Sequence, residues 1–156
     1  MKISASYWIF DGGLEGTLPI KSAMEQASKM GFEGIELGIA SQGVLTHNTS
    51  QAECEEIVRE AEKHGLEISG VASGESWTTS PTANDEDVRK KIIDFTQKAL
   101  QITHWLGTDA YLFVPGAVEV FFLPDAEVIP YDAVSYTHLR AHETSLHLVC
   151  RLLLEK

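Results

Sequence analysis

The chain has few cysteines and no long apolar run. Only two of its 156 residues are Cys, so no disulfide framework is expected, and this favours a reducing compartment. No apolar stretch approaches the roughly 20 residues that cross a bilayer, and the first residues lack the basic and apolar regions of a secretory signal. We therefore expect a cytoplasmic protein with no membrane partner.

Basic residues are also scarce. Lys and Arg number 12 against 23 Asp and Glu, which gives a formal net charge of −11. Affinity for DNA or RNA comes largely from Lys and Arg that displace counterions from phosphates, so no nucleic-acid partner is expected. The hydrophobic content of 44% is ordinary for a globular protein with one core.

Strand and helix signals alternate along the first 116 residues. Apolar, β-branched stretches predict strands that begin near residues 2, 34, 67 and 110, the first one running through residue 10. Between them, apolar residues at helical spacing and capping signals predict helices over about 19–30, 50–65 and 84–107. The second helix opens with a capping box, Ser50 to Glu53.

This order indicates an α/β fold with a parallel sheet, covered by helices through right-handed crossovers. Four βα units in about 116 residues make half of an eight-fold barrel, which needs roughly 250 residues. They equally fit a complete doubly wound sheet of four or five strands. The spacing of the strands alone does not separate the two folds.

Several motifs along the chain carry a resemblance to a known family. They are Ser6-Tyr7-Trp8, the stretch 29–37 that contains Gly-Phe-Glu-Gly-Ile-Glu-Leu, and the stretches 65–68, 105–107 and 114–116. Over most of residues 1–132 the chain resembles the sugar phosphate isomerase/epimerase group of the xylose isomerase-like TIM barrels. The resemblance implies a truncated (β/α)8 barrel, with residues 1–132 as its amino-terminal half.

The same resemblance implies the chemistry of the parent enzyme. A divalent metal (Mn, Mg, Zn or Co), held by Glu, Asp, His and Glu from later strands, polarises a sugar carbonyl. A Glu then removes the neighbouring proton to give an enediolate. These positions would all follow Asp132. We therefore expect no catalytic residue and no metal site in this chain, and an inactive fragment whose small-molecule partner is a sugar or sugar phosphate.

Four residues of the first half are candidates for substrate binding: Glu36, Tyr7, Glu75 and His47. Strand alternation places Ile35 and Leu37 against helices and Glu36 inside the barrel, near the strand end where such enzymes keep their sites. A structural ion pair is the equal alternative for Glu36. Tyr7 is interpreted either as an aromatic residue that lines the substrate pocket or as one that packs in the core. Glu75 and His47 are interpreted either as contacts to the substrate at the rim of the barrel or, more simply, as solvated loop residues.

The last 23 residues resemble a translated DNA-library adapter. Residues 134–144 read VSYTHLRAHET and residues 148–156 read LVCRLLLEK, and both match the adapter codon by codon around a variable barcode. The adapter frame allows only Ser, Pro, Thr or Ala before Val134, and Ala133 is there. It allows only Tyr, His, Asn or Asp at the end of the barcode, where His147 stands. We expect residues 133–156 to be adapter-encoded; the alternatives are a real amphipathic helix and a zinc pair of His138 and His142.

Two other functions remain open. The chain is a non-catalytic sugar-binding or scaffold protein if its sheet closes by itself. An endonuclease IV-like DNA-repair enzyme shares the broader barrel family, but the acidic charge disfavours it. A half barrel has two unpaired strand edges, so self-association of the chain is also expected.

Overall fold

The computed structural model describes residues 2–120, 123 and 128–135. The chain divides into two compact units. The first comprises Met1–Glu75 and Ile93–Phe113, and the second comprises Ser76–Ile92 and Val114–Lys156. The expected tail from residue 136 onward, with the His138 and His142 pair, lies outside the described residues. Within the described part of the chain, no helix is both long and apolar enough to cross a membrane.

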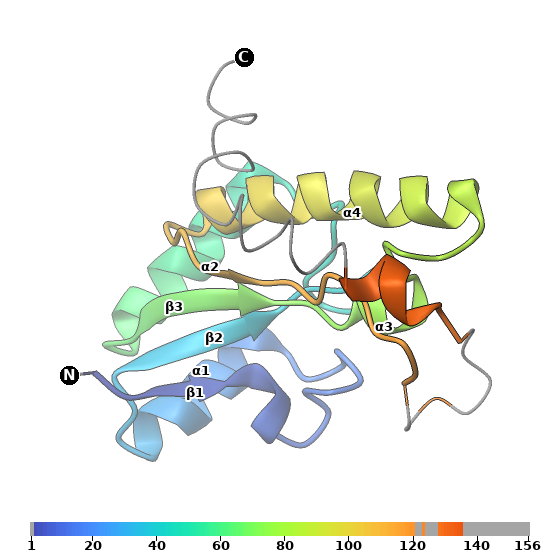
Figure 1. Ribbon diagram of the computed structural model, residues 1–156. Helices are drawn as coiled ribbons and strands as arrows, with labels where there is room; N and C mark the ends of the chain where they lie inside the picture. Colours follow the sequence, from blue (N-terminus) through green and yellow to red (C-terminus); the bar gives the residue numbers. More distant parts are fainter. Residues whose placement is uncertain (1, 121–122, 124–127, 136–156) are drawn as a thin grey trace. The chain divides into compact units, whose positions relative to one another are not determined.

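The first unit contains a four-stranded parallel sheet in the order β1-β2-β3-β4. Its strands are β1 (Ser4–Ser6), β2 (Gly34–Gly38), β3 (Glu67–Ala72) and β4 (Tyr111–Leu112). Figure 1 shows β1, β2 and β3 side by side with their arrowheads at the same edge. The four expected strands are therefore confirmed in order and in parallel sense, and their carboxyl ends meet at one edge of the sheet.

The first strand is shorter than the sequence predicts. β1 ends at Ser6, and the 3-10 turn η1 (Tyr7–Ile9) follows in place of further strand. The reason is tertiary, because the Tyr7 hydroxyl donates a hydrogen bond of 2.5 Å to the carbonyl of Leu18. The Tyr7 carbonyl also accepts from the Phe10 N–H at 3.4 Å. These bonds turn the chain away from the sheet at the edge where the strands end.

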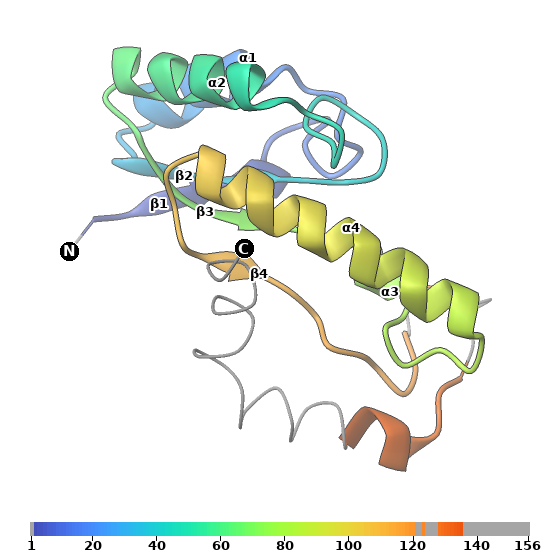
Figure 2. The same cartoon turned by 90° about the horizontal axis from the view of Figure 1, so that it is seen from above.

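Helices α1 (Ile20–Lys29) and α2 (Gln51–Lys63) follow the first two strands. The capping box at the start of α2 is confirmed, because Ser50 and Glu53 each bind the backbone N–H of the other. At the end of α1, Gly31 has a φ of 84°, a conformation that costs a residue with a Cβ atom. In Figure 2 the two helices lie next to each other on the same side of the strands.

Alternation along the strands gives the sheet a helix-facing side and an opposite side, here called the inner face. Ile35 and Leu37 are fully buried on the helix-facing side, where α1 contacts β2 and α2 contacts β3. Burial of each such side chain favours folding by about 1.5–3 kcal/mol. Ser6, Glu36 and Gly38 alternate with these positions and lie on the inner face.

One irregularity interrupts the sheet. Ile35 pairs with Ile68, but the next residue, Glu36, pairs with Gly70, so Ser69 is an extra residue in β3. Such a bulge bends its strand and leaves the extra residue without a cross-strand partner. Ser69 is exposed. The shift brings Gly70 level with Glu36 and with Ser6 of β1, so one row of the sheet holds a serine, a glutamate and a glycine.

Two further helices join the units. The short α3 (Glu75–Thr78) begins at the last residue of the first unit, and it was not expected from the sequence. Helix α4 (Glu86–Trp105) confirms the third expected helix and has residues in both units. In the second unit, the Arg89 guanidinium donates to the carbonyls of Ala83 and Asn84 at 2.6 and 2.8 Å and closes the turn before α4.

Candidate functional site

The inner face carries one polar contact between neighbouring strands. The Ser6 hydroxyl donates a hydrogen bond of 2.9 Å to Oε1 of Glu36. Both side chains are half-buried, and their residues are level in the β1–β2 register. Only one carboxylate oxygen of Glu36 is used in this bond, so the other retains its capacity to accept a hydroxyl group.

An aromatic side chain lies one step further along the inner face. A Cβ atom added at Gly38 would come within 2.9 Å of the Trp8 Nε1 atom and 3.1 Å of the Tyr7 Cδ1 atom. The absence of a side chain at Gly38 therefore lets both aromatic rings approach the strand. We call Ser6, Trp8, Glu36 and Gly38 the Glu36 cluster. It combines a carboxylate, a hydroxyl and a half-buried indole near the carboxyl end of β2.

Tyr7 and Trp8 differ in what they offer a ligand. Tyr7 is buried and its hydroxyl donates to Leu18, while burial raises the pKa of the phenol above its usual value. Trp8 is half-buried, and its ring N–H is the group nearest to the space above Gly38. Sequence reasoning selected Tyr7 as the candidate. The glycine at position 38, on the neighbouring strand, was the available signal for Trp8.

Glu75 has a specific structural contact. Its Oε1 atom accepts the backbone N–H of Ser41 at 2.7 Å, and its own N–H donates to the Ser73 hydroxyl at 3.3 Å. Glu75 thus ties the loop after β2 to the segment after β3, at the edge where the strands end. It is half-buried. The preferred expectation of a merely solvated residue missed this contact, which spans 34 positions of sequence.

Tyr111 lies close to Glu75 and Ser73 in the same unit. Its hydroxyl is buried and has no hydrogen-bond partner of good geometry. Burial raises the pKa of Tyr111 to about 12; the nearby Ser73 hydroxyl lowers it less, and the Glu75 charge adds to the rise. Tyr111 pairs in register with Val71, which is buried on the helix-facing side. Its phenol therefore belongs to that side of the sheet and not to the Glu36 cluster.

His47 lies in the loop after β2 and contacts an aromatic residue of α4. The centroids of the His47 and Phe95 rings are 5.4 Å apart, with the ring planes tilted by 58°. The Nδ1 atom of His47 is buried and has no hydrogen-bond partner. Of the expected site residues, only Glu36 lies in the cluster itself; the Tyr7 ring borders it, and Glu75 and His47 have the separate contacts described above.

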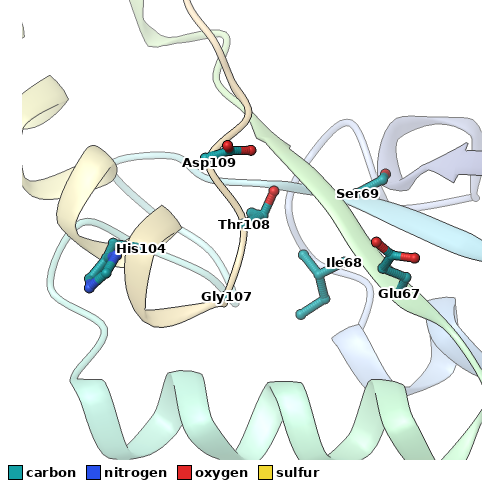
Figure 3. A pocket seen from close by; sticks show the side chains of 7 residues that line it. All are labelled: Glu67, Ile68, Ser69, His104, Gly107, Thr108 and Asp109. Atoms are coloured by element: carbon teal, nitrogen blue, oxygen red, sulfur yellow. The ribbon is translucent and has the colours of Figure 1, made fainter. Parts of the chain in front are cut away.

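A pocket of about 530 Å³ lies at the amino ends of β3 and β4 (Figure 3), at the edge of the sheet opposite to the carboxyl ends of the strands. It is lined by Glu67, Ile68 and Ser69 of β3 and by His104, Gly107, Thr108 and Asp109 before β4. Active sites of (β/α)8 barrels are at the carboxyl ends of the strands, so this pocket is at the other edge. In the described part of the chain, no three His, Cys, Asp or Glu residues are grouped to hold a metal ion.

Comparisons with known proteins agree on the fold. Residues 24–144 match the family model described as the xylose isomerase-like TIM barrel. A solved structure of D-psicose 3-epimerase with D-tagatose from Clostridium cellulolyticum H10 superposes with a TM-score of 0.65 at 17% identity, over 91% of this chain and 46% of that one. A D-psicose 3-epimerase in the presence of D-fructose gives a TM-score of 0.64 at 17% identity, over 90% and 45%.

This chain therefore spans less than half the length of these solved epimerases. No curated protein matches it in sequence. The fold expectation is confirmed: the four parallel strands with their helices are a half barrel, and the doubly wound alternative is set aside.

Proposed function

We propose that this chain, which belongs to the xylose isomerase-like TIM barrel family, carries the amino-terminal part of a sugar-binding site that serves a sugar isomerase or epimerase. The observation that carries the proposal is the Glu36 cluster on the inner face. A carboxylate held by Ser6 accepts hydrogen bonds from sugar hydroxyls. The indole of Trp8 offers an apolar surface for the C–H groups of a sugar and a ring N–H for an oxygen.

The charge of the cluster favours an unphosphorylated sugar. Its one ionisable side chain is the carboxylate of Glu36, and its other members are Ser6, Trp8 and Gly38. A carboxylate repels a phosphate dianion and accepts neutral hydroxyl groups. Both solved epimerases are described with ketohexoses, D-tagatose and D-fructose. Ketohexoses are therefore the proposed substrate class, and a ketose phosphate is expected to bind less tightly.

We do not assign the metal-dependent step of the reaction to the Glu36 cluster. The described residues do not form the ligand set that the family resemblance implies, so Glu36 and Trp8 are proposed to bind and orient the sugar only. Proton transfer through an enediolate is proposed for the parent enzyme, on residues outside the described part of this chain. We expect the 156-residue chain to bind sugar without turnover; measurable epimerisation of D-fructose by the purified chain would refute this.

The test is a binding titration with D-psicose, D-tagatose and D-fructose, followed by Trp fluorescence and calorimetry. Glu36→Gln is expected to weaken binding by about tenfold, because a hydrogen bond to a charged acceptor becomes a neutral one. Glu56→Gln, on the exposed face of α2, is the matched control and is expected to bind as the wild type does. Equal affinities of the two variants, or no sugar binding by the wild type, would refute the proposal.

A further inference from the structure

Both outer edges of the sheet carry backbone groups that point away from it. On β1 the carbonyl of Ile3 accepts the Glu33 N–H, so Ile3 and Ala5 face β2. Because backbone direction alternates along a strand, the N–H and C=O groups of Ser4 and Ser6 point to the open edge. Residues 2–120, 123 and 128–135 include no strand that pairs with this edge.

Backbone direction alternates in the same way along β4. The carbonyls of Ala110 and Leu112 accept the N–H groups of Val71 and Ser73, at 2.9 and 3.4 Å. The backbone groups of Tyr111 and Phe113 therefore point to the other open edge, which in the described part of the chain is also unpaired. Two large apolar side chains stand beside it, with Leu112 49% and Phe113 37% exposed.

We propose that a second copy of this chain pairs with both edges and closes an eight-stranded parallel barrel. The β4 edge of each copy would bind the β1 edge of the other. The described residues supply four strands, and the chain spans 46% of a solved epimerase with this fold. Eight strands close a barrel of this class, so two copies complete it. A two-fold axis along the barrel makes the two seams identical, which ends the assembly at a dimer.

The pairing of the two copies is expected to depend on salt. The total charge acts against it, since each copy carries −11. Added salt screens that long-range repulsion, so the dimer is expected to become tighter as salt rises.

The experiment is a mass measurement on the full 156-residue chain by light scattering after gel filtration, over a range of concentrations. The wild type is expected at twice the mass of one chain. Phe113→Pro removes an N–H that points to the open edge and leaves the bonds of Ala110 and Leu112 to β3 in place. It is expected to raise the dissociation constant of the dimer by about tenfold or more, because both seams lose a bond.

Phe113→Ala is the matched control, because it removes the same side chain but keeps the N–H. It is expected to remain dimeric. Ser4→Pro tests the other edge in the same way and decides the matter if circular dichroism shows that Phe113→Pro does not fold. A monomeric wild type, a ladder of species larger than a dimer, or proline variants that associate as tightly as Phe113→Ala would each overturn the proposal.

Discussion

Ser6 and Glu36 lie on neighbouring strands and meet through a hydrogen bond of 2.9 Å on the inner face of the sheet. Their main chains are also paired in register. The side-chain bond therefore adds no chain-closure cost to a contact that the backbone has already made. It holds the carboxylate in one orientation, which is what a site that recognises hydroxyl groups by position requires.

A double-mutant cycle measures this bond. Ser6→Ala and Glu36→Ala are each expected to lower the free energy of unfolding, and the double variant is expected to lower it by less than the sum. The coupling should be about 1 kcal/mol, the usual net value of a hydrogen bond to a partly exposed partner. Urea unfolding of the four proteins gives the value. A coupling near zero would mean that Glu36 is oriented without Ser6.

Gly38→Ala tests the close approach of Trp8. The added methyl group would come within 2.9 Å of the Trp8 Nε1 atom, so the indole must move. A loss of about 1–3 kcal/mol in the free energy of unfolding is expected from the overpacking, together with a shifted Trp emission spectrum. Gly70→Ala, level with Glu36 on β3, is the control, because its added Cβ atom would meet Ala110 and not Trp8. Identical spectra of Gly38→Ala and the wild type would contradict the assigned ring position.

Acid is expected to weaken the contact between α1 and α2 through Glu60. Hydrogen bonds from Lys63 and Lys21 lower the pKa of Glu60 from 4.5 to about 2, with Nζ–O distances of 2.9 and 3.3 Å. Because the folded state holds the charged form, the stabilisation is present above pH 4.5 and is lost as the pH falls towards 2. Glu60→Gln should flatten that part of a stability–pH curve, whereas the exposed Glu56→Gln should not.

Alkali is expected to act through Tyr111. Its pKa is raised from 10.0 to about 12 by burial, so the folded state favours the neutral phenol. The resulting stabilisation is complete below pH 10 and is lost as the pH rises towards 12. Tyr111→Phe should remove this alkaline limb. Since the buried hydroxyl has no well-aligned partner, the variant should be as stable as the wild type at neutral pH or slightly more so. A large loss there would indicate a strong bond to the hydroxyl.

Sequencing of the source DNA tests whether residues 133–156 are encoded by an adapter. Sequencing outward from the codons of residues 130–132 is expected to show a reading frame that departs from the printed tail and continues into further βα units. Source DNA that encodes Val134 to Lys156 would contradict the adapter hypothesis and would make the His138 and His142 pair a candidate zinc site again.

Local signals in the sequence were sufficient for helices α1, α2 and α4 and for strand β2. The Ser50–Glu53 capping box and the glycine after α1 act within a few residues, so their outcome is legible from the sequence. The alternation that places Ile35 and Leu37 against helices and Glu36 on the inner face is equally local. These features predict the parallel α/β sheet and the central residue of the candidate site, whereas the half barrel was implied by the family resemblance.

Long-range contacts account for what the sequence did not reveal. β1 stops at Ser6 because the next residue, Tyr7, bonds to Leu18, and no nearby residue signals that partner. The sequence around Glu75 indicates only a loop residue, because the backbone N–H that binds its carboxylate belongs to Ser41, 34 positions away. Trp8 gains its position from a glycine on another strand. In each case the deciding neighbour comes from tertiary folding, which a reading of local periodicity does not contain.

Because β3 contains an extra residue, β2 and β3 are expected to differ in how well they tolerate the insertion or deletion of one residue. In β2, one residue gained or lost before Glu36 would turn the carboxylate towards the helices and bring an isoleucine or leucine to the inner face. In β3, deletion of Ser69 would bring Ile68 and Gly70 into regular succession opposite Ile35 and Glu36. Among homologous proteins, deletions of one residue should therefore be found at position 69 of β3 and should be absent from β2.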